Sequence, residues 1–532
     1  MAFAVLILSG CGAGSGNSAS DSGGGGASGG GSTGGGGNNG TPSPVLPAVV
    51  SVTPTGNAVS VNAPIEVTFN KAMKKATFIT ALDGLGLGVG YDPRCVDDSD
   101  CKTIWFFRGT NLEYNKSYTL TLLPQGRDQD GNLLSSAYKW TFKTAPFASP
   151  LSLVTIDGQN RAEPDAGECT AVAVDSMGTT HIVYYSESIG APKHAFCLSG
   201  TDCTVSGNWT IEVIETPPQG RKFGRDINMA IDANDTLHVS YRDVDSFAGG
   251  IKGDGFGILK YVKAVKSGST WTWAPPVIVD DTVNAVEDTY IAVSGNVVHI
   301  SYRKTGDSPD QDTLAYATCA ASCNQFANWS TVDIEQGNGA GAPNHIVVTG
   351  SAIHISYYLN GTLKYITCVI PNGCIDPKHW TSVVVDDGGG NQFIVGRENS
   401  LAVDGNVIHI TYRDNTNRLL KYARCTSGSS CANAQNWKNA GIDAAGGSTQ
   451  VTVAGGYIHV SYRDDLNKYL KYARCLSSSD CLDPKDWSIY TIDTLGEVGW
   501  DTYLGVESNG TIHISYRDFG NQDLKYASGV IP

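Results

Sequence analysis

The sequence predicts an all-β protein in which a β-sandwich precedes a seven-bladed β-propeller. One six-residue motif carries most of this prediction, because it occurs seven times and its histidine recurs every 50–61 residues. A fixed period near 50 residues indicates an array of like units. Each unit contains runs of alternating apolar residues, and no helical period of useful length competes. The cleanest copy is HISYRD, from His513 to Asp518, and the others begin at His181, His238, His299, His354, His409 and His459.

Length and charge set the first limits. A chain of 532 residues is too long for one ordinary core, so we expect at least two domains. The formal net charge of −15 and the lack of a basic tract argue against a nucleic-acid partner. The 63 glycines suit a secreted β protein with many tight turns.

Most of the fourteen cysteines come in close pairs. Zinc sites usually show C-x2-C and need two such pairs, whereas here each pair stands alone in its own unit. Local disulfides formed in an oxidising compartment are therefore predicted. Cys169 has no obvious mate and is interpreted as a buried thiol. The predicted disulfides are Cys95–Cys101, Cys197–Cys203, Cys319–Cys323, Cys368–Cys374, Cys425–Cys431 and Cys475–Cys481.

The chain begins with the apolar run 2–8, which ends at Leu8-Ser9-Gly10-Cys11. This stretch resembles the lipobox of bacterial lipoproteins. The resemblance implies that residues 1–11 are a signal peptide with its lipobox, and that acylated Cys11 attaches the protein to a lipid membrane. It also implies an outer-membrane or cell-surface location, with the bulk in the periplasm or outside the cell. The alternative is a chance Ser-Gly-Cys after a short apolar run, since no positive n-region precedes it.

Residues 12–45 are almost wholly small and polar, so they predict a flexible tether. Residues 46–146 then show six or seven short alternating strands, which is typical of a β-sandwich. This domain resembles the SbsA-type bacterial Ig-like domain. The resemblance implies a spacer or adhesive module. It rests on four segments, Val49 to Pro54, Ile65 to Met73, Asp128 to Leu134 and Trp140 to Thr144.

Residues 147–532 carry the repeats. The copy around His409 reads as four strands, 400–405, 406–414, 419–425 and 437–442. Four strands repeated every 55 residues or so indicate propeller blades. The last copy has only three strands, and 151–157 matches the fourth-strand type. This strand should complete the last blade and close the ring, which removes open edges. We expect a monomer.

The repeated histidine is interpreted as structural. Seven equivalent histidines on a large ring are too dispersed for one metal ion or one reaction centre. Each is expected to be buried between blades and to hydrogen-bond a neighbouring strand. The repeated tyrosines, the LKY tripeptides and the fourth-strand tryptophans are likewise assigned to the core. No catalytic residue and no metal ligand follow from the repeats.

Ligand-binding candidates lie where the second strand ends and the first begins, because both points share one face of a propeller. These positions differ between copies, and a site for one ligand must break the sevenfold symmetry. One alternative is a rim of guanidinium groups for carboxylate or sulfate, with aromatic faces for sugars. The other is an Arg–Asp pair that locks each turn. The second-strand candidates are Arg242, Arg303, Arg413, Arg463 and Arg517, with Tyr185 and Tyr358 at the same position in the two remaining copies. In one copy Lys304 replaces the motif aspartate. The first-strand candidates are Tyr290, His345, Arg397, Glu398, Trp500, Asp501 and Tyr503, beside Asp226, Asp288, Asn399 and Gln450.

Calcium is the one cofactor considered. The longest loops, Val244 to Gly257 and 306–312, carry aspartates whose oxygens suit Ca²⁺, but no regular calcium-loop spacing is present. Solvated loops are the alternative here and at the insert between Cys95 and Cys101. The aspartates are Asp243, Asp245, Asp254, Asp307, Asp310 and Asp312, and Asp97, Asp98 and Asp100 in the insert.

The repeat resembles the HISYYD…LKYA repeats of secreted bacterial propellers, loosely akin to sialidase-like folds. The S-x-D-x-G-x-T-W boxes of sialidases are absent, so no catalytic residue is carried over. Three hypotheses remain: a surface lipoprotein that binds glycan or protein on one propeller face, a polysaccharide-active enzyme, and a structural envelope protein. A lyase needs an arginine and a base, and the first candidates are His345, Tyr290, Tyr358 and Arg397. A hydrolase needs two carboxylates, such as Asp288 and Glu398.

Overall fold

The computed structural model describes residues 45–531, except 62, 86–90, 97–100, 109–111, 159–164, 245–256, 282–284, 307, 391–393, 427 and 445. The described residues divide into two compact units between Ala148 and Ser149. The predicted lipobox at Cys11 and nearly all of the predicted tether lie outside the described residues.

Strands make up almost all of the regular structure, as predicted. The described residues contain no α-helix. None of the helices found in them is long and apolar enough to span a membrane. The short 3-10 helices are η1 (Lys75–Phe78), η2 (Ser206–Asn208), η3 (Pro309–Gln311), η4 (Phe326–Asn328), η5 (Ile370–Asn372), η6 (Pro377–His379), η7 (Gly428–Ala432), η8 (Ala434–Asn436) and η9 (Pro484–Asp486).

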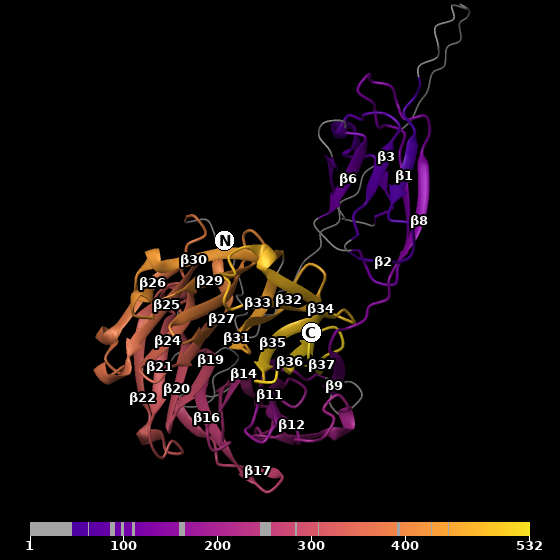
Figure 1. The fold of residues 1–532 in the computed structure, drawn as a ribbon. Helices are drawn as coiled ribbons and strands as arrows, with labels where there is room; N and C mark the ends of the chain where they lie inside the picture. Colours follow the sequence, from indigo (N-terminus) through magenta and orange to yellow (C-terminus); the bar gives the residue numbers. More distant parts are fainter. Residues whose placement is uncertain are drawn as a thin grey trace, which may run out of the picture. The chain divides into compact units, whose positions relative to one another are not determined.

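The N-terminal unit is a sandwich of two four-stranded sheets (Figure 1). Alternation explains its core: in β7 the residues Tyr118, Leu120 and Leu122 are buried while their neighbours are more exposed. The two inner faces share one apolar core. The first sheet has the order β1 (Val49–Thr53), β3 (Glu66–Phe69), β6 (Thr103–Arg108), β5 (Tyr91–Cys95), and the second β2 (Gly56–Val59), β8 (Tyr138–Thr144), β7 (Ser117–Leu122), β4 (Leu82–Asp83).

The second unit contains seven antiparallel sheets within its described residues, here called sheets 1 to 7 in chain order. Each is a meander of four strands, except that β16 of sheet 2 pairs with both β17 and β18. Sheets 1 to 3 are β10 (Glu168–Val174), β11 (Thr180–Ser186), β12 (Ala191–Cys197), β13 (Trp209–Val213); β14 (Phe223–Ile231), β15 (Leu237–Asp243), β16 (Ile258–Ser267), β17 (Thr270–Trp273), β18 (Val277–Asp280); and β19 (Ala285–Ser294), β20 (Val297–Thr305), β21 (Thr313–Cys319), β22 (Ser330–Gln336).

The remaining four sheets repeat the plan. They are β23 (Asn344–Val348), β24 (Ala352–Leu359), β25 (Thr362–Val369), β26 (Trp380–Asp386); β27 (Val395–Asp404), β28 (Val407–Asp414), β29 (Leu419–Cys425), β30 (Trp437–Ala444); β31 (Gly446–Ala454), β32 (Tyr457–Asp464), β33 (Tyr469–Leu476), β34 (Trp487–Asp493); and β35 (Val498–Val506), β36 (Ile512–Asp518), β37 (Asp523–Gly529), β9 (Ser152–Asp157).

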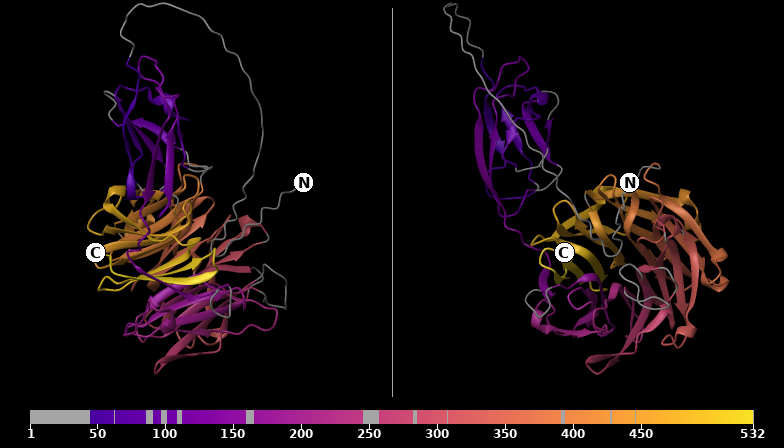
Figure 2. Two further views of the ribbon diagram at one scale, coloured as in Figure 1. Left: turned by 90° about the vertical axis from the view of Figure 1, so that its right-hand side faces the viewer. Right: turned by 180° about the vertical axis from the view of Figure 1, so that it is seen from behind.

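The last sheet combines both ends of this unit. Strand β9 pairs antiparallel with β37, with Tyr526 opposite Val154. The first strand of each sheet contacts the first strand of the next, and β35 of sheet 7 contacts β10 of sheet 1. Figures 1 and 2 show the sheets following one another in a propeller-like arrangement.

The repeated histidine is buried in every copy, as predicted. In six sheets its Nδ1 lies 2.6–2.7 Å from the hydroxyl of the tyrosine that ends the LKY tripeptide, or of Tyr316 at the equivalent position of sheet 3, on the neighbouring strand. In sheet 1, His194 takes the place of that tyrosine, 3.0 Å from His181 Nδ1. Burial lowers the pKa of His299, His354 and His409 to about 4, so these rings are neutral near pH 7.

The motif serine bonds the next sheet. Its hydroxyl meets a threonine or asparagine near the start of the next first strand. Sheet 1 is the exception, because Val183 stands in the serine position. Its counterpart Ile227 is also apolar, and both are buried in one cluster. The polar pairs are Ser515–Thr170, Ser240–Thr289, Ser301–Asn344, Ser356–Asn399, Thr411–Thr449 and Ser461–Thr502.

The motif tyrosine completes a third connection. Its hydroxyl donates to a carboxylate on or just after the fourth strand of the preceding sheet, and a lysine pairs with the same carboxylate. In six sheets the lysine comes from the LKY tripeptide or its equivalent. In sheet 3 that position is Ala315, and Lys304 supplies the charge instead. The sets are Tyr184–Asp157–Lys193, Tyr241–Glu215–Lys260, Tyr302–Asp280–Lys304, Tyr357–Glu335–Lys364, Tyr412–Asp386–Lys421, Tyr462–Asp443–Lys471 and Tyr516–Asp493–Lys525.

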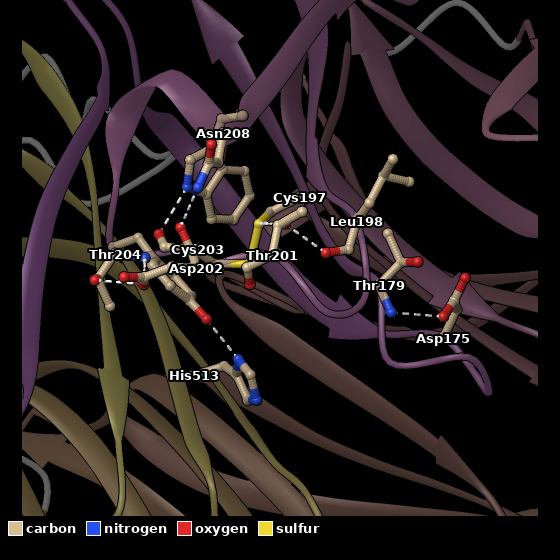
Figure 3. Close-up of a disulfide and its surroundings, with 12 residues drawn as sticks. Asp175, Thr179, Cys197, Leu198, Thr201, Asp202, Cys203, Thr204, Asn208 and His513 are labelled. Carbon is tan, nitrogen blue, oxygen red and sulfur yellow. Dashed lines mark hydrogen bonds between the residues drawn. A yellow bond between two sulfur atoms is a disulfide. The ribbon is translucent and has the colours of Figure 1, made fainter.

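All six predicted disulfides are present. Figure 3 shows the Cys197–Cys203 loop, where Thr201 and Asn208 donate to backbone carbonyls of the loop. The prediction for Cys169 was wrong. Cys169 is a disulfide cysteine rather than a thiol. A cysteine that belongs to no close pair carries no local sequence pattern that would reveal its partner.

Candidate functional site

A cavity of about 200 Å³ lies where the first strands of the seven sheets begin, and every sheet contributes to its wall. We call it the axial pocket. Its lining residues are Cys169 and Thr170; Asp226, Ile227 and Asn228; Asp288, Thr289 and Tyr290; Ala342 and Pro343; Arg397, Glu398 and Asn399; Ser448 and Thr449; and Asp501, Thr502 and Tyr503.

An unusual backbone conformation places these residues. In six sheets the pairing of the first and second strands shifts register at this point, as in a β-bulge. One residue of each bulge has a left-handed φ, which costs a non-glycine residue on the order of 1 kcal/mol or more. The bulge turns the chain toward the pocket. These residues are Cys169 (φ 52°), Asp226 (54°), Asp288 (51°), Glu398 (50°), Ser448 (42°) and Asp501 (50°).

Four of these six bulge residues are acidic, and arginines of the second strands lie behind them. The Nε of Arg242 is 3.3 Å from Asp226. Arg303 Nη1 is 3.6 Å from Asp288. The two bulge residues that are not acidic are Cys169 in sheet 1, whose second strand carries Tyr185, and Ser448 in sheet 6, whose second strand carries Arg463. Every acidic bulge residue therefore lies in a sheet with the motif arginine, but the arginine does not require an acidic bulge residue.

The carboxyl groups of the pocket have different protonation behaviour. Burial, and next the charge of Asp226, raise the pKa of Asp288 to about 8. Burial also raises the pKa of Asp501 to about 6, against the opposing charge of Arg517. At neutral pH the pocket therefore holds a protonated carboxylic acid on Asp288.

The five second-strand arginines predicted as a ligand rim are all in ion pairs. Each has at least one carboxylate within 4 Å, so its charge is compensated within the protein. The pairs are Arg242 with Asp226 and Glu287; Arg303 with Glu287, Asp288 and Asp312; Arg413 with Glu398 and Asp465; Arg463 with Asp465; and Arg517 with Asp165 and Glu168.

Where tyrosine replaces the arginine, another arginine stands above its ring. Arg225 Cζ lies 5.5 Å from the ring centroid of Tyr185, and Arg397 Cζ lies 5.1 Å from that of Tyr358. Both arginines immediately precede a bulge residue. A guanidinium group is thus present beside every second strand of the array. Sequence reasoning missed Arg225, but a comparison of the two tyrosine copies would have shown that each is followed by Arg-acid in the next repeat.

Some of the other first-strand candidates line the axial pocket, and others are packed outside its lining. Tyr290 and Tyr503 line the axial pocket, as do Glu398 and Asp501. His345 is buried, with its ring 4.4 Å from that of Tyr290, and its Nδ1 accepts a hydrogen bond from the Leu401 backbone at 2.9 Å. Burial lowers the pKa of His345 to about 3, so it stays neutral.

Trp500 does not line the pocket. Arg463 Cζ lies 4.0 Å from its ring centroid, and the Phe519 ring is 5.7 Å away. The indole therefore packs beneath a paired arginine. The pocket-lining residues that were not predicted as ligand-binding candidates are mainly uncharged ones, above all Ser448, Thr449 and Cys169.

No group of three or more His, Cys, Asp or Glu side chains within the described part of the chain is placed to hold a metal ion. Asp312 is paired with Arg303 at 2.7 Å, and Asp243 lies 3.3 Å from Lys260. Asp310 lies in η3. The candidates Asp97, Asp98, Asp100, Asp245, Asp254 and Asp307 lie outside the described residues, so calcium binding there stays a prediction.

Comparison with known families identifies the family of the N-terminal unit. Residues 44–144 match the family described as bacterial Ig-like domain. This segment is a bacterial Ig-like domain. The predicted bacterial Ig-like domain is therefore confirmed, and its sandwich of two sheets agrees with it.

No curated protein matches the chain. Among solved structures, the chain is similar to a protein of unknown function from Dyadobacter fermentans, at 10% identity and a TM-score of 0.43, covering 72% of this chain and 98% of that one. It is similar to an α-L-arabinofuranosidase of Fusarium graminearum in complex with arabinobiose, at 12% identity and a TM-score of 0.43, covering 72% of this chain and 97% of that one. A third similar structure is that of the polysaccharide lyase Uly1, at 11% identity and a TM-score of 0.42, covering 67% of this chain and 88% of that one.

Proposed function

We propose that residues 147–532 form a seven-bladed β-propeller, closed by β9, that binds a glycan in the axial pocket. In this proposal the Ig-like domain is a spacer that presents the propeller. Pairing of β9 with β37 and contact between β35 and β10 support closure of the ring.

The contrast between the contacts that join the sheets and the axial pocket carries the proposal. The hydrogen bonds that join the sheets repeat with few changes, whereas the bulge residues and tyrosines that line the pocket differ from sheet to sheet. A wall that varies around the axis suits one asymmetric ligand. Carboxylates, hydroxyls and two tyrosine rings are the groups that bind sugars, which have hydroxyls at their edges and apolar faces.

A glycan array with the full-length protein tests this function. We expect binding that falls at least tenfold when Tyr503→Ala removes one aromatic wall of the pocket. Phe107→Ala, on β6 of the Ig-like domain, serves as the control and should leave binding unchanged. Binding that is equal in wild type and Tyr503→Ala, or lost in Phe107→Ala, would mean that the ligand binds elsewhere.

The second candidate is a glycoside hydrolase. Asp288, which is protonated at neutral pH, and Asp226, which is paired with Arg242, lie in the same pocket. A protonated acid beside a second carboxyl group is the arrangement that glycosidases use. Release of reducing ends from a polysaccharide panel, abolished by Asp288→Asn, would establish this activity. Binding without any release, by the wild type, would argue against it.

The lyase alternative receives less support from the geometry. Its candidate base His345 already uses Nδ1 to accept a backbone hydrogen bond. Two further lyase candidates, Tyr358 and Arg397, are stacked on each other.

We also propose that acylated Cys11 holds the protein at the outer membrane or cell surface. The sequence Leu8-Ser9-Gly10-Cys11 supports this. Cys11→Ser should move the protein from the membrane fraction to the soluble fraction. Unchanged membrane attachment of this variant would refute the proposal.

A further inference from the structure

The repeats provide an internal comparison for Arg397. Arg225 and Arg397 occupy the same place in two copies, since each precedes a bulge acid and stands over the tyrosine of the preceding sheet. Differences between their surroundings therefore show what one of them lacks.

Arg225 is neutralised by its surroundings. Its Nη2 donates to Glu187 Oε2 at 2.8 Å, and Glu168 Oε2 lies 4.0 Å away. Glu187 follows Tyr185 by two residues, and Glu168 precedes the bulge residue of sheet 1. Both acids therefore occupy positions that can be matched in sheet 4.

Arg397 has neither acid. The position two residues after Tyr358 is Asn360, and the position before Pro343 is Ala342. Within the described residues, Arg397 makes no ion pair and no hydrogen bond. Its buried Nε lacks a partner, as does that of Arg225, so the two arginines differ at their terminal nitrogens. The neighbouring Glu398 pairs with Arg413 and accepts from the Ser448 backbone.

This uncompensated guanidinium lines the axial pocket. Arg397 as a whole is half-buried, but its Nε is shielded from solvent, and an unpaired donor of fixed charge there is costly unless a partner arrives. Stacking on Tyr358 orients the planar group, and guanidinium groups bind oxyanions through two parallel hydrogen bonds. We propose that Arg397 binds an oxyanion of the glycan, a carboxylate or a sulfate, so that the pocket selects acidic sugars.

The acidic side chains other than protonated Asp288 limit the number of such groups. Asp226, Glu398 and Asp501 disfavour further negative charge near them. The ligand therefore carries one oxyanion per bound sugar, at Arg397, with hydroxyls toward the acids. This inference rests on the proposed glycan binding and names its ligand class.

The test uses the full-length protein on an array of matched glycans: a neutral oligosaccharide, its uronate counterpart and its monosulfated counterpart. We expect one acidic form to bind at least about tenfold more tightly than the neutral parent, because an added charged hydrogen-bond pair contributes on that order. The form that binds distinguishes carboxylate from sulfate.

Three variants assign the preference. Arg397→Gln should reduce the acidic-to-neutral ratio to about one, and Ala342→Glu should do the same by supplying the missing carboxylate. Arg225→Gln is the matched control and should keep the wild-type ratio. A neutral glycan that binds wild type as tightly as its acidic forms overturns the inference and leaves glycan binding intact. A preference that survives in Arg397→Gln also overturns it.

A second measurement covers the case in which no glycan binds, which would refute the proposed function itself. Thermal unfolding is then followed in sodium glucuronate and sodium sulfate against sodium chloride at equal ionic strength. Stabilisation that disappears in Arg397→Gln but persists in Arg225→Gln supports an oxyanion site. Equal shifts in all three proteins show adventitious ion binding only and overturn the inference.

Discussion

Tyr184 donates a hydrogen bond to Asp157 at 2.6 Å, and these two residues join sheet 1 to the strand that completes sheet 7. Lys193 lies 2.6 Å from the same carboxylate, and all three side chains are buried. The same set of tyrosine, acid and lysine recurs between the other neighbouring sheets. At this place it connects the two ends of the array.

Removal of Asp157 tests that connection. Asp157→Ala removes the buried carboxylate that accepts from Tyr184 and pairs with Lys193, so we expect the propeller to lose about 3 kcal/mol of unfolding free energy. Urea denaturation followed by tryptophan fluorescence measures the loss. Asp333→Ala is the control, because Asp333 pairs with Lys304 but is 60% exposed, and it should cost less than about 1 kcal/mol. Equal effects would contradict the role of Asp157.

The apolar pair Val183 and Ile227 replaces a hydroxyl pair. Val183→Ser alone places a hydroxyl against Ile227 without a partner and should cost about 1–3 kcal/mol. Adding Ile227→Thr restores the pair found between other sheets, so the double variant should lose less than the sum of the single variants. Simple additivity in a double-mutant cycle would show that the two positions do not interact.

Lys304 substitutes for the lysine missing at position 315. Lys304→Ala leaves Asp280 buried without its lysine, so we expect destabilisation of about 3 kcal/mol. Ala315→Lys, added to Lys304→Ala, should recover part of that loss, since lysine occupies this position in the other sheets. Failure of the second substitution to recover any stability would mean that position 315 cannot present a charge to Asp280.

Asp288 should make stability depend on pH. Its folded pKa of about 8 lies above the value near 3.9 in the unfolded chain. The folded state thus binds more protons between these limits, and the unfolding free energy should fall as pH rises from about 4 to about 8. In Asp288→Asn this fall should be smaller. Parallel pH profiles of the two proteins would show that Asp288 is ionised in the folded state.

The repeat made much of the fold predictable. The motif marked each second strand, period-2 alternation marked the strands around it, and the pattern of 151–157 indicated its pairing with the last sheet. Buried histidines and six local disulfides also followed, because each depends on residues close in sequence. The disulfide of Cys169 did not, since no cysteine near it in the chain is its mate.

The pocket was only partly predictable. Glu398, Asp501, Tyr290 and Tyr503 were found because they interrupt the repeat. Ser448 was missed, because a left-handed bulge cannot be recognised from a serine alone. Lys304 stood out as an exception in the motif, yet it pairs with Asp280. Exceptions therefore include both compensating changes within the core and residues that face the pocket.

The central claim is that a glycan binds in the axial pocket. A crystal structure of the protein with the glycan that binds best on the array tests it most directly. We predict a sugar ring within hydrogen-bond distance of Asp288 and Arg397 and against Tyr503. A sugar bound on the Ig-like domain or on the outer strands, with the axial pocket empty, would contradict this claim.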